Sequence, residues 1–192
     1  MLDSIKQKLE QINLIDKTKY KKAGVLIILL EDERDGEYKL LFTKRSSNLS
    51  THSGEVSFPG GMREEHDSSL YDTALRESNE EINLDINNIE KLGRLNFLLS
   101  RHKIEVHPFV GILCNPQEFK GNYEIDEIFD VPVSYLLDEE NIIWQELERD
   151  GIKFKSPSWS YNGFKIWGLT AMITAIFVND YFDAGIKLDW KR

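Results

Sequence analysis

An apolar run at residues 23–30 (AGVLIILL) constrains the fold of this chain more than any other feature. Its length and its β-branched residues predict a buried strand. The polar stretch that follows carries Asp35-Gly36, a pair typical of tight turns, and residues 39–44 (KLLFTK) predict a returning strand. The chain therefore starts its sheet with a hairpin.

The order of the later segments indicates an α+β fold. Residues 45–62, rich in Ser, Gly and Pro, predict a loop, and a helix is predicted over residues 68–82, with Asp67, Ser68 or Ser69 as its N-cap and Asn83 as its end. We then expect strands at 91–99, 106–113 and 127–133, with Pro132 at an edge or strand end, a hairpin at 159–167 turned at Asn162-Gly163, and a closing helix at 169–181. This order is not a regular βαβ alternation.

The length and charge of the chain limit what it can be. A chain of 192 residues suits a single domain, which we assign to residues 1–192. Its net charge of -9 argues against nonspecific nucleic-acid binding, because such binding uses clustered cations. Its single cysteine, Cys114, forms no intrachain disulfide and fits a reducing compartment.

The sequence predicts no membrane segment. Residues 1–20 are expected to form an amphipathic lead-in helix and lack the apolar core of a signal peptide. The longest apolar runs, at residues 23–30 and 169–178, are shorter than the ~20 residues that span a bilayer. We therefore expect a cytoplasmic protein that does not engage a membrane, and the sequence leaves a homodimer open.

The most informative segment is Arg76-Glu77-Ser78-Asn79-Glu80-Glu81, within the predicted helix. At ~100° per residue, Glu77, Glu80 and Glu81 share one sector at the border of the apolar face. Glu77 and Glu81 are like charges at i, i+4 and repel, so a cation is needed between them. Mg²⁺ prefers oxygen ligands of this kind, and Arg76 can pair with Glu80.

An isolated acidic run of this type is more often a solvated helix face. Here, however, Pro59-Gly60-Gly61 and a loop precede the helix, and residues 61–84 as a whole resemble the signature of the Nudix hydrolase family. That resemblance implies an α/β/α sandwich with a mixed β-sheet, the signature helix on one side and a C-terminal helix on the other. It also implies that Glu77, Glu80 and Glu81 bind the metal.

The match to the signature departs from the family pattern in four places. Asp67 stands where glutamate is usual, one extra residue precedes Arg76, Ser78 replaces an apolar residue, and Asn83 replaces glycine. Asn83 is the mildest departure, because asparagine tolerates the left-handed conformation. The extra residue before Arg76, together with the shorter side chain of Asp67, would move this acid off the metal. Asp67 is therefore expected beside the metal ligands rather than among them.

Residues 41–46 (LFTKRS) and 52–61 (HSGEVSFPGG) resemble a further motif of the coenzyme A diphosphatase branch of this family, which also shares the extra residue before Arg76. Ser50 stands where that branch has an arginine. The resemblance suggests that Arg45, Lys44, Gly60 and Gly61 contact a nucleoside diphosphate substrate, although the two cations could also simply solvate a strand end.

The implied reaction is Mg²⁺-dependent hydrolysis of coenzyme A to 4'-phosphopantetheine and adenosine 3',5'-bisphosphate, with Mn²⁺ as the alternative ion. Arg76 is expected to position the carboxylates. Glu80 is the first candidate for the general base, and Glu124 and Glu127 are the downstream alternatives. Two rival functions stay open: a Nudix hydrolase of ADP-ribose or a dinucleotide, and a nucleotide-binding module without turnover.

Overall fold

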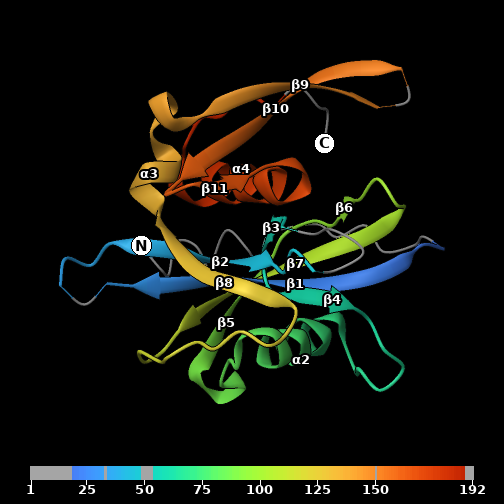
Figure 1. The fold of residues 1–192 in the computed structure, drawn as a ribbon, viewed down its shortest axis with the longest axis vertical. Coiled ribbons are helices and arrows are strands. Elements are labelled where there is room, and N and C mark those ends of the chain that lie inside the picture. The colour runs from blue at the N-terminus through green and yellow to red at the C-terminus, as the bar shows by residue number, and fades with distance from the viewer. Residues whose placement is uncertain (1–18, 33, 49–53, 150, 189–192) are drawn as a thin grey trace.

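The computed structural model describes residues 19–32, 34–48, 54–149 and 151–188, so the predicted lead-in helix lies outside the described residues but for its last two. The elements form around one large sheet and one small one (Figure 1). In chain order they are β1 (Lys21–Glu31), β2 (Tyr38–Arg45), β3 (Val56–Ser57), β4 (Gly60–Met62), α2 (Leu70–Ile82), η1 (Ile86–Asn88), β5 (Ile89–Arg94), β6 (Leu98–Leu99), β7 (Ile104–Leu113), β8 (Ile125–Pro132), α3 (Val133–Leu137), η2 (Glu139–Asn141), β9 (Ile143–Arg149), β10 (Ile152–Tyr161), β11 (Phe164–Ile166) and α4 (Gly168–Phe182).

Strand β1, which contains the apolar run, is the centre of the large sheet. The main path of that sheet runs β3-β2-β1-β7-β5, with β4 also pairing β1, β6 pairing β7 and β8 pairing β2. β1 and β7 are parallel and the other pairs are antiparallel, so the sheet is mixed as expected. Successive residues of β1 alternate between its two faces, and Leu26 to Leu29 are fully buried because both faces are covered.

The two faces of the sheet carry one helix each (Figure 1). Leu26 and Ile28 pack with Ala74 and Ile82 of α2 in one apolar cluster. Ile27 and Leu29 belong to the other cluster, which includes the buried side chains of α4. The predicted α+β sandwich, with the acidic helix on one side and the C-terminal helix on the other, is confirmed.

The second sheet, β11-β10-β9, packs on α4 through β10. Its strands β9 and β10 lie on the side of α4 away from the large sheet (Figure 1), whereas β11 contacts β3 of the large sheet. It contains the predicted hairpin turn, where Asn162 and Gly163 both have positive φ. β9 and α3 were not predicted from the sequence. β9 is rich in charged residues and exposes Ile143 and Trp144, so its apolar pattern is weak and backbone pairing with β10 decides its strand form.

The sequence predictions for two segments were wrong in detail. The strand expected at residues 91–99 is divided into β5 and β6, because their partner β7 has Pro108 opposite the break and proline has no N–H to donate. The loop expected at residues 45–62 contains β3 and β4. Pro132 does end β8, which pairs on one side with β2, and Val133 already begins α3.

Within the described part of the chain, no helix is both long and apolar enough to cross a membrane.

Candidate active site

Helix α2 holds the predicted carboxylates, and its two ends are defined by the residues expected there. Ser69 is the N-cap, and its side chain accepts a hydrogen bond from the Asp72 N–H at 3.1 Å. Asn83 ends the helix in the left-handed conformation, with φ of 56°. Gly24 of β1 lies against the first turn, where a Cβ would come within 2.3 Å of the Leu70 carbonyl oxygen. α2 therefore packs closely on the central strand.

Asp67 does not cap the helix but binds Arg76. Its carboxylate accepts hydrogen bonds from Arg76 Nε at 3.0 Å and Nη2 at 3.2 Å, and from the Thr73 hydroxyl at 2.8 Å. Asp67 is buried, and the hydrogen bonds from Arg76 hold the pKa of its carboxyl well below the usual range. This two-point contact fixes the plane of the guanidinium.

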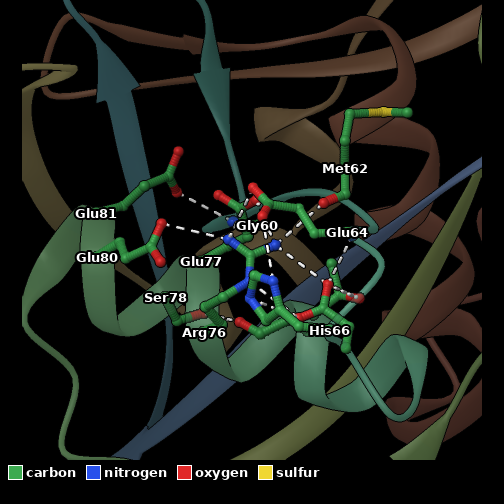
Figure 2. A network of polar contacts seen from close by, with 12 residues as sticks. Gly60, Met62, Glu64, His66, Arg76, Glu77, Ser78, Glu80 and Glu81 are labelled. Carbon is green, nitrogen blue, oxygen red and sulfur yellow. Dashed lines mark hydrogen bonds and ion pairs between the residues drawn. The ribbon is translucent and has the colours of Figure 1, made fainter.

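Arg76 in turn connects the loop before the helix to two of the predicted metal ligands (Figure 2). Its Nη2 donates to the Met62 carbonyl at 3.1 Å and lies 3.0 Å from Glu77 Oε1, while Nη1 lies 3.3 Å from Glu80 Oε2. The predicted pairing of Arg76 with Glu80 is present. The guanidinium therefore holds the helix and the preceding loop in one network.

Glu81 is the most buried of the three glutamates, with 4% of its surface exposed. Its Oε2 accepts a hydrogen bond from the Gly60 N–H at 3.0 Å, and its Oε1 accepts one from Arg45 Nη1 at 3.3 Å. Burial raises the pKa of Glu81 to about 7, although both hydrogen bonds act in the opposite direction. Its charge is thus poorly solvated and calls for a cation.

Glu77 lies against Gly61 of β4. A Cβ at Gly61 would come within 2.4 Å of the Glu77 carboxyl carbon, so only glycine leaves room for this carboxylate. At Gly60 the backbone has φ of 147° and a Cβ would lie 2.4 Å from the Gly24 carbonyl oxygen. Burial raises the pKa of Glu77 as well. The glycines therefore serve here to bring β4 against both β1 and the acidic face of α2.

Glu80 lies in a different environment from the other two carboxylates. Its side chain is 54% exposed, against 18% for Glu77 and 6% for Glu81. In the described residues, no three His, Cys, Asp or Glu side chains gather as a ready metal site. The structure therefore places a partly buried Glu77 and a buried Glu81 on one side of α2, with Glu80 at the solvent edge.

Glu77 and Glu81 nevertheless suit Mg²⁺. This ion takes oxygen donors, keeps several waters, and is commonly held by one or two carboxylates together with substrate phosphates. Glu77 and Glu81 supply such oxygens, and burial disfavours their charges until a cation neutralises them. In the metal-free protein, Arg45 and Arg76 supply that positive charge in part.

The candidate substrate cations Lys44 and Arg45 lie on opposite faces of β2, because they are consecutive residues of a strand. Arg45 lies on the α2 face, where its Nη2 also donates to Glu124 Oε2 at 2.9 Å. Lys44 lies on the α4 face, with its Nζ 2.7 Å from Glu127 Oε1 and 5.8 Å from the centre of the Phe164 ring. Glu127 is thus held away from Glu77 and Glu81, whereas Glu124 joins their surroundings.

Glu124 is brought to the site by a loop whose position no local pattern indicated. The Lys120 and Asn122 N–H groups donate to the Ile82 and Glu81 carbonyls, at 3.1 Å and 3.0 Å. These bonds satisfy two carbonyls at the end of α2, which lack partners within the helix. They also place Glu124 beside Arg45.

A comparison with protein families decides the family of this chain. The protein-family model described as the NUDIX domain matches residues 20–147. The chain belongs to the Nudix family. The elements from β1 to β9 lie within or overlap the matched region, so the acidic helix α2 is the Nudix helix.

Relatives with known names agree with this family. The chain is 42% identical over 165 residues to Nudix hydrolase 15, mitochondrial, of Arabidopsis thaliana, covering 82% of this chain and 58% of that protein. It is 42% identical over 160 residues to Nudix hydrolase 22, chloroplastic, of the same plant, with coverages of 80% and 53%. The chain thus spans little more than half the length of these two relatives. It is also 38% identical over 138 residues to the uncharacterized Nudix hydrolase NudL of Yersinia enterocolitica, covering 71% of each chain.

Solved structures share the fold at low sequence identity. A MutT/nudix family protein from Enterococcus faecalis aligns with a TM-score of 0.54 and 15% identity, over 95% of this chain and 68% of that one. The binary complex of a C. elegans Ap4A hydrolase aligns with a TM-score of 0.50 and 19% identity, over 61% of this chain and 83% of that one. These similarities support the fold of the Nudix chain.

We expect Gly61→Ala to damage the site while leaving the fold intact. The added Cβ collides with the far end of the flexible Glu77 side chain, which can turn away, but the carboxylate is then displaced. A displacement of about 1 Å costs on the order of 100-fold in activity. The measurement is kcat/KM together with a thermal melt, and Met62→Ala, at the next and exposed position, is the matched control. Unchanged activity in Gly61→Ala would contradict the geometry.

The raised pKa of Glu81 predicts a pH-dependent stability in metal-free protein. Its folded pKa of about 7 exceeds the ordinary 4.5, so its stabilising contribution is complete below pH 4.5 and is lost as the pH rises through about 7. Relative to Glu81→Gln, the free energy of unfolding should fall by about 3 kcal/mol across this interval. Urea titrations in EDTA measure the difference, with Glu80→Gln as the exposed control. Parallel pH profiles for the parent and Glu81→Gln would refute the prediction.

Proposed function

We propose that this chain is a divalent-metal-dependent diphosphate hydrolase whose substrate is coenzyme A or one of its derivatives. The observation that carries the proposal is the partly buried Glu77 and the buried Glu81 on the Nudix helix, with Glu81 bound by the backbone N–H of Gly60 and by Arg45. The motif that resembles the coenzyme A diphosphatase branch supplies these last two residues. Strands β2 and β4, which contain residues of this motif, bring Arg45 and Gly60 to the Glu81 carboxylate.

Each residue of the site has a distinct part in the proposed reaction. Glu77 and Glu81 would hold Mg²⁺ or Mn²⁺, with Glu80 as an outer ligand. The metal, when bound, neutralises phosphate oxygens and lowers the pKa of the attacking water. Arg76, held by Asp67, keeps Glu77 and Glu80 in position. Arg45 has two carboxylate partners, and a cation between Glu77 and Glu81 would release it from Glu81 toward a substrate phosphate.

The general base is proposed to be Glu80 or Glu124. Glu80 is half-exposed beside Glu77 and Glu81, and Glu124 is 30% exposed and paired with Arg45. Glu127, the third acid considered, is paired with Lys44 on the other face of the sheet. The cytoplasmic location and the homodimer stay predictions.

One observation favours a second substrate class. Ser50, which replaces the arginine of the coenzyme A branch, removes a cation from the motif, and it lies outside the described residues. The alternative is therefore a Nudix hydrolase of another nucleoside diphosphate compound, such as ADP-ribose or a dinucleotide.

A panel of substrates with Mg²⁺ tests the proposed function. We expect the highest kcat/KM with coenzyme A or its thioesters, compared with ADP-ribose, NADH and nucleoside triphosphates. Glu77→Gln and Glu81→Gln should each lower kcat by about 100-fold or more, because each removes a charged metal ligand. Preference for another compound overturns the substrate, whereas full activity in both variants overturns hydrolysis at this site.

The general base can be assigned by comparing Glu80→Gln with Glu124→Gln. Loss of the base should lower kcat by about 100-fold or more and abolish the acidic limb of the pH–rate profile. The other variant should keep that limb, and Glu127→Gln is the control on the opposite face of the sheet. Retention of the limb in both variants would rule out Glu80 and Glu124 alike.

A further inference from the structure

A cavity of about 270 Å³ lies at the start of α2, bounded by β1, β5, β7 and the loop before the helix. Its lining includes four cationic side chains, Lys22, Arg63, Lys91 and Arg94, together with His107. The carboxylates Glu77 and Glu81 are not among its lining residues. From Leu70 to Glu81 the helix rises roughly 16 Å, so this cavity is separate from the candidate active site.

The cations around this cavity have little opposing charge. Lys22 Nζ lies 3.8 Å from Glu105 Oε2, but no carboxylate in the described part of the chain is within ion-pair distance of Arg63, Lys91 or Arg94. Three such cations around one hollow repel one another, and this chain is otherwise acidic, with a net charge of -9. The arrangement favours an anion.

Contacts with neighbouring groups orient two of these cations. Arg63 Nη2 donates to the Asp67 carbonyl at 3.1 Å, and Lys91 Nζ lies 4.3 Å from the centre of the Tyr71 ring. Neither contact neutralises the charge. Leu70 and Tyr71, the first two residues of α2, also line the cavity, and N–H groups in a first helical turn have no acceptor within the helix.

His107 adds a polar group that is more than nine-tenths buried. Its Nε2 lies 3.2 Å from Glu105 Oε2, and its Nδ1 makes no hydrogen bond within the described residues. When Nε2 donates to this carboxylate, Nδ1 presents a lone pair. A lone pair among cations can accept a hydrogen bond from an oxyanion that carries a hydroxyl, such as monoprotonated phosphate.

We propose that this cavity binds a phosphoryl group, as inorganic phosphate or as the phosphomonoester end of a nucleotide. The volume is below that of pockets that enclose drug-sized ligands, which suits a small anion or one end of a larger molecule. Lysine, arginine and helix N–H groups are the donors that proteins use for phosphate. The site would act independently of the hydrolysis proposed above.

Calorimetric titration of metal-free full-length chain tests this site, with inorganic phosphate in one arm and adenosine 3',5'-bisphosphate in the other, at constant ionic strength. The double variant Lys91→Gln/Arg94→Gln should weaken binding at least about tenfold, because it removes two charge-assisted donors. Arg63→Gln is an independent second variant on a different element. The matched control is Lys153→Gln/Lys165→Gln, which removes the same charge from exposed positions of the second sheet.

The expected result is saturable binding that is weakened in the two cavity variants and unchanged in the control. The tighter of the two anions identifies the source of the phosphoryl group. The proposal is overturned if neither anion binds, or if the cavity variants and the control bind with equal affinity. Because no arm measures hydrolysis, these outcomes are distinguishable from failure of the proposed function. Thermal melts confirm that each variant is folded.

Discussion

The buried carboxylate of Glu81 is the constraint on which the rest of the site depends. A carboxylate removed from water must find hydrogen-bond donors, and here they come from the Gly60 N–H on β4 and from Arg45 on β2. β4 can reach Glu81 only because its two glycines allow it to lie against β1 and α2 at once. Three elements that are separate in the sequence, β2, β4 and α2, thus form the site, and the position of each depends on the others.

Arg76 gives this assembly its second fixed point. Its guanidinium binds Asp67 at two positions and also contacts the Met62 carbonyl and two glutamates, so it ties the loop between β4 and α2 to the helix. An acid at position 67 consequently influences the site through the arginine rather than by direct contact with a metal. This arrangement accommodates both Asp67 and the additional residue before Arg76.

The two ends of α2 have opposite electrostatic character. Lys22, Arg63, Lys91 and Arg94 gather around its first turn, whereas Glu77 and Glu81 lie toward its last turn. The positive end of a helix dipole favours anions and the negative end favours cations. Carboxylates near the negative end are therefore doubly unfavourable until a cation binds, and the two proposed sites, one for an anion and one for a cation, lie toward opposite ends of one helix.

Much of the fold was predictable from residues that act locally. The sequence determined the buried strand at residues 23–30, the helix that ends at Asn83, and the common sector of its glutamates, because apolar periodicity and capping depend on neighbours in the chain. It left three candidates for the N-cap, and the structure shows that Ser69 fills this role. Only the tertiary structure decided that Glu81 is buried and Glu80 exposed, that Asp67 binds Arg76, and that Lys44 and Glu127 face away from Arg45. Burial and ion pairing depend on which distant elements pack together, and the pattern of neighbouring residues does not specify that packing.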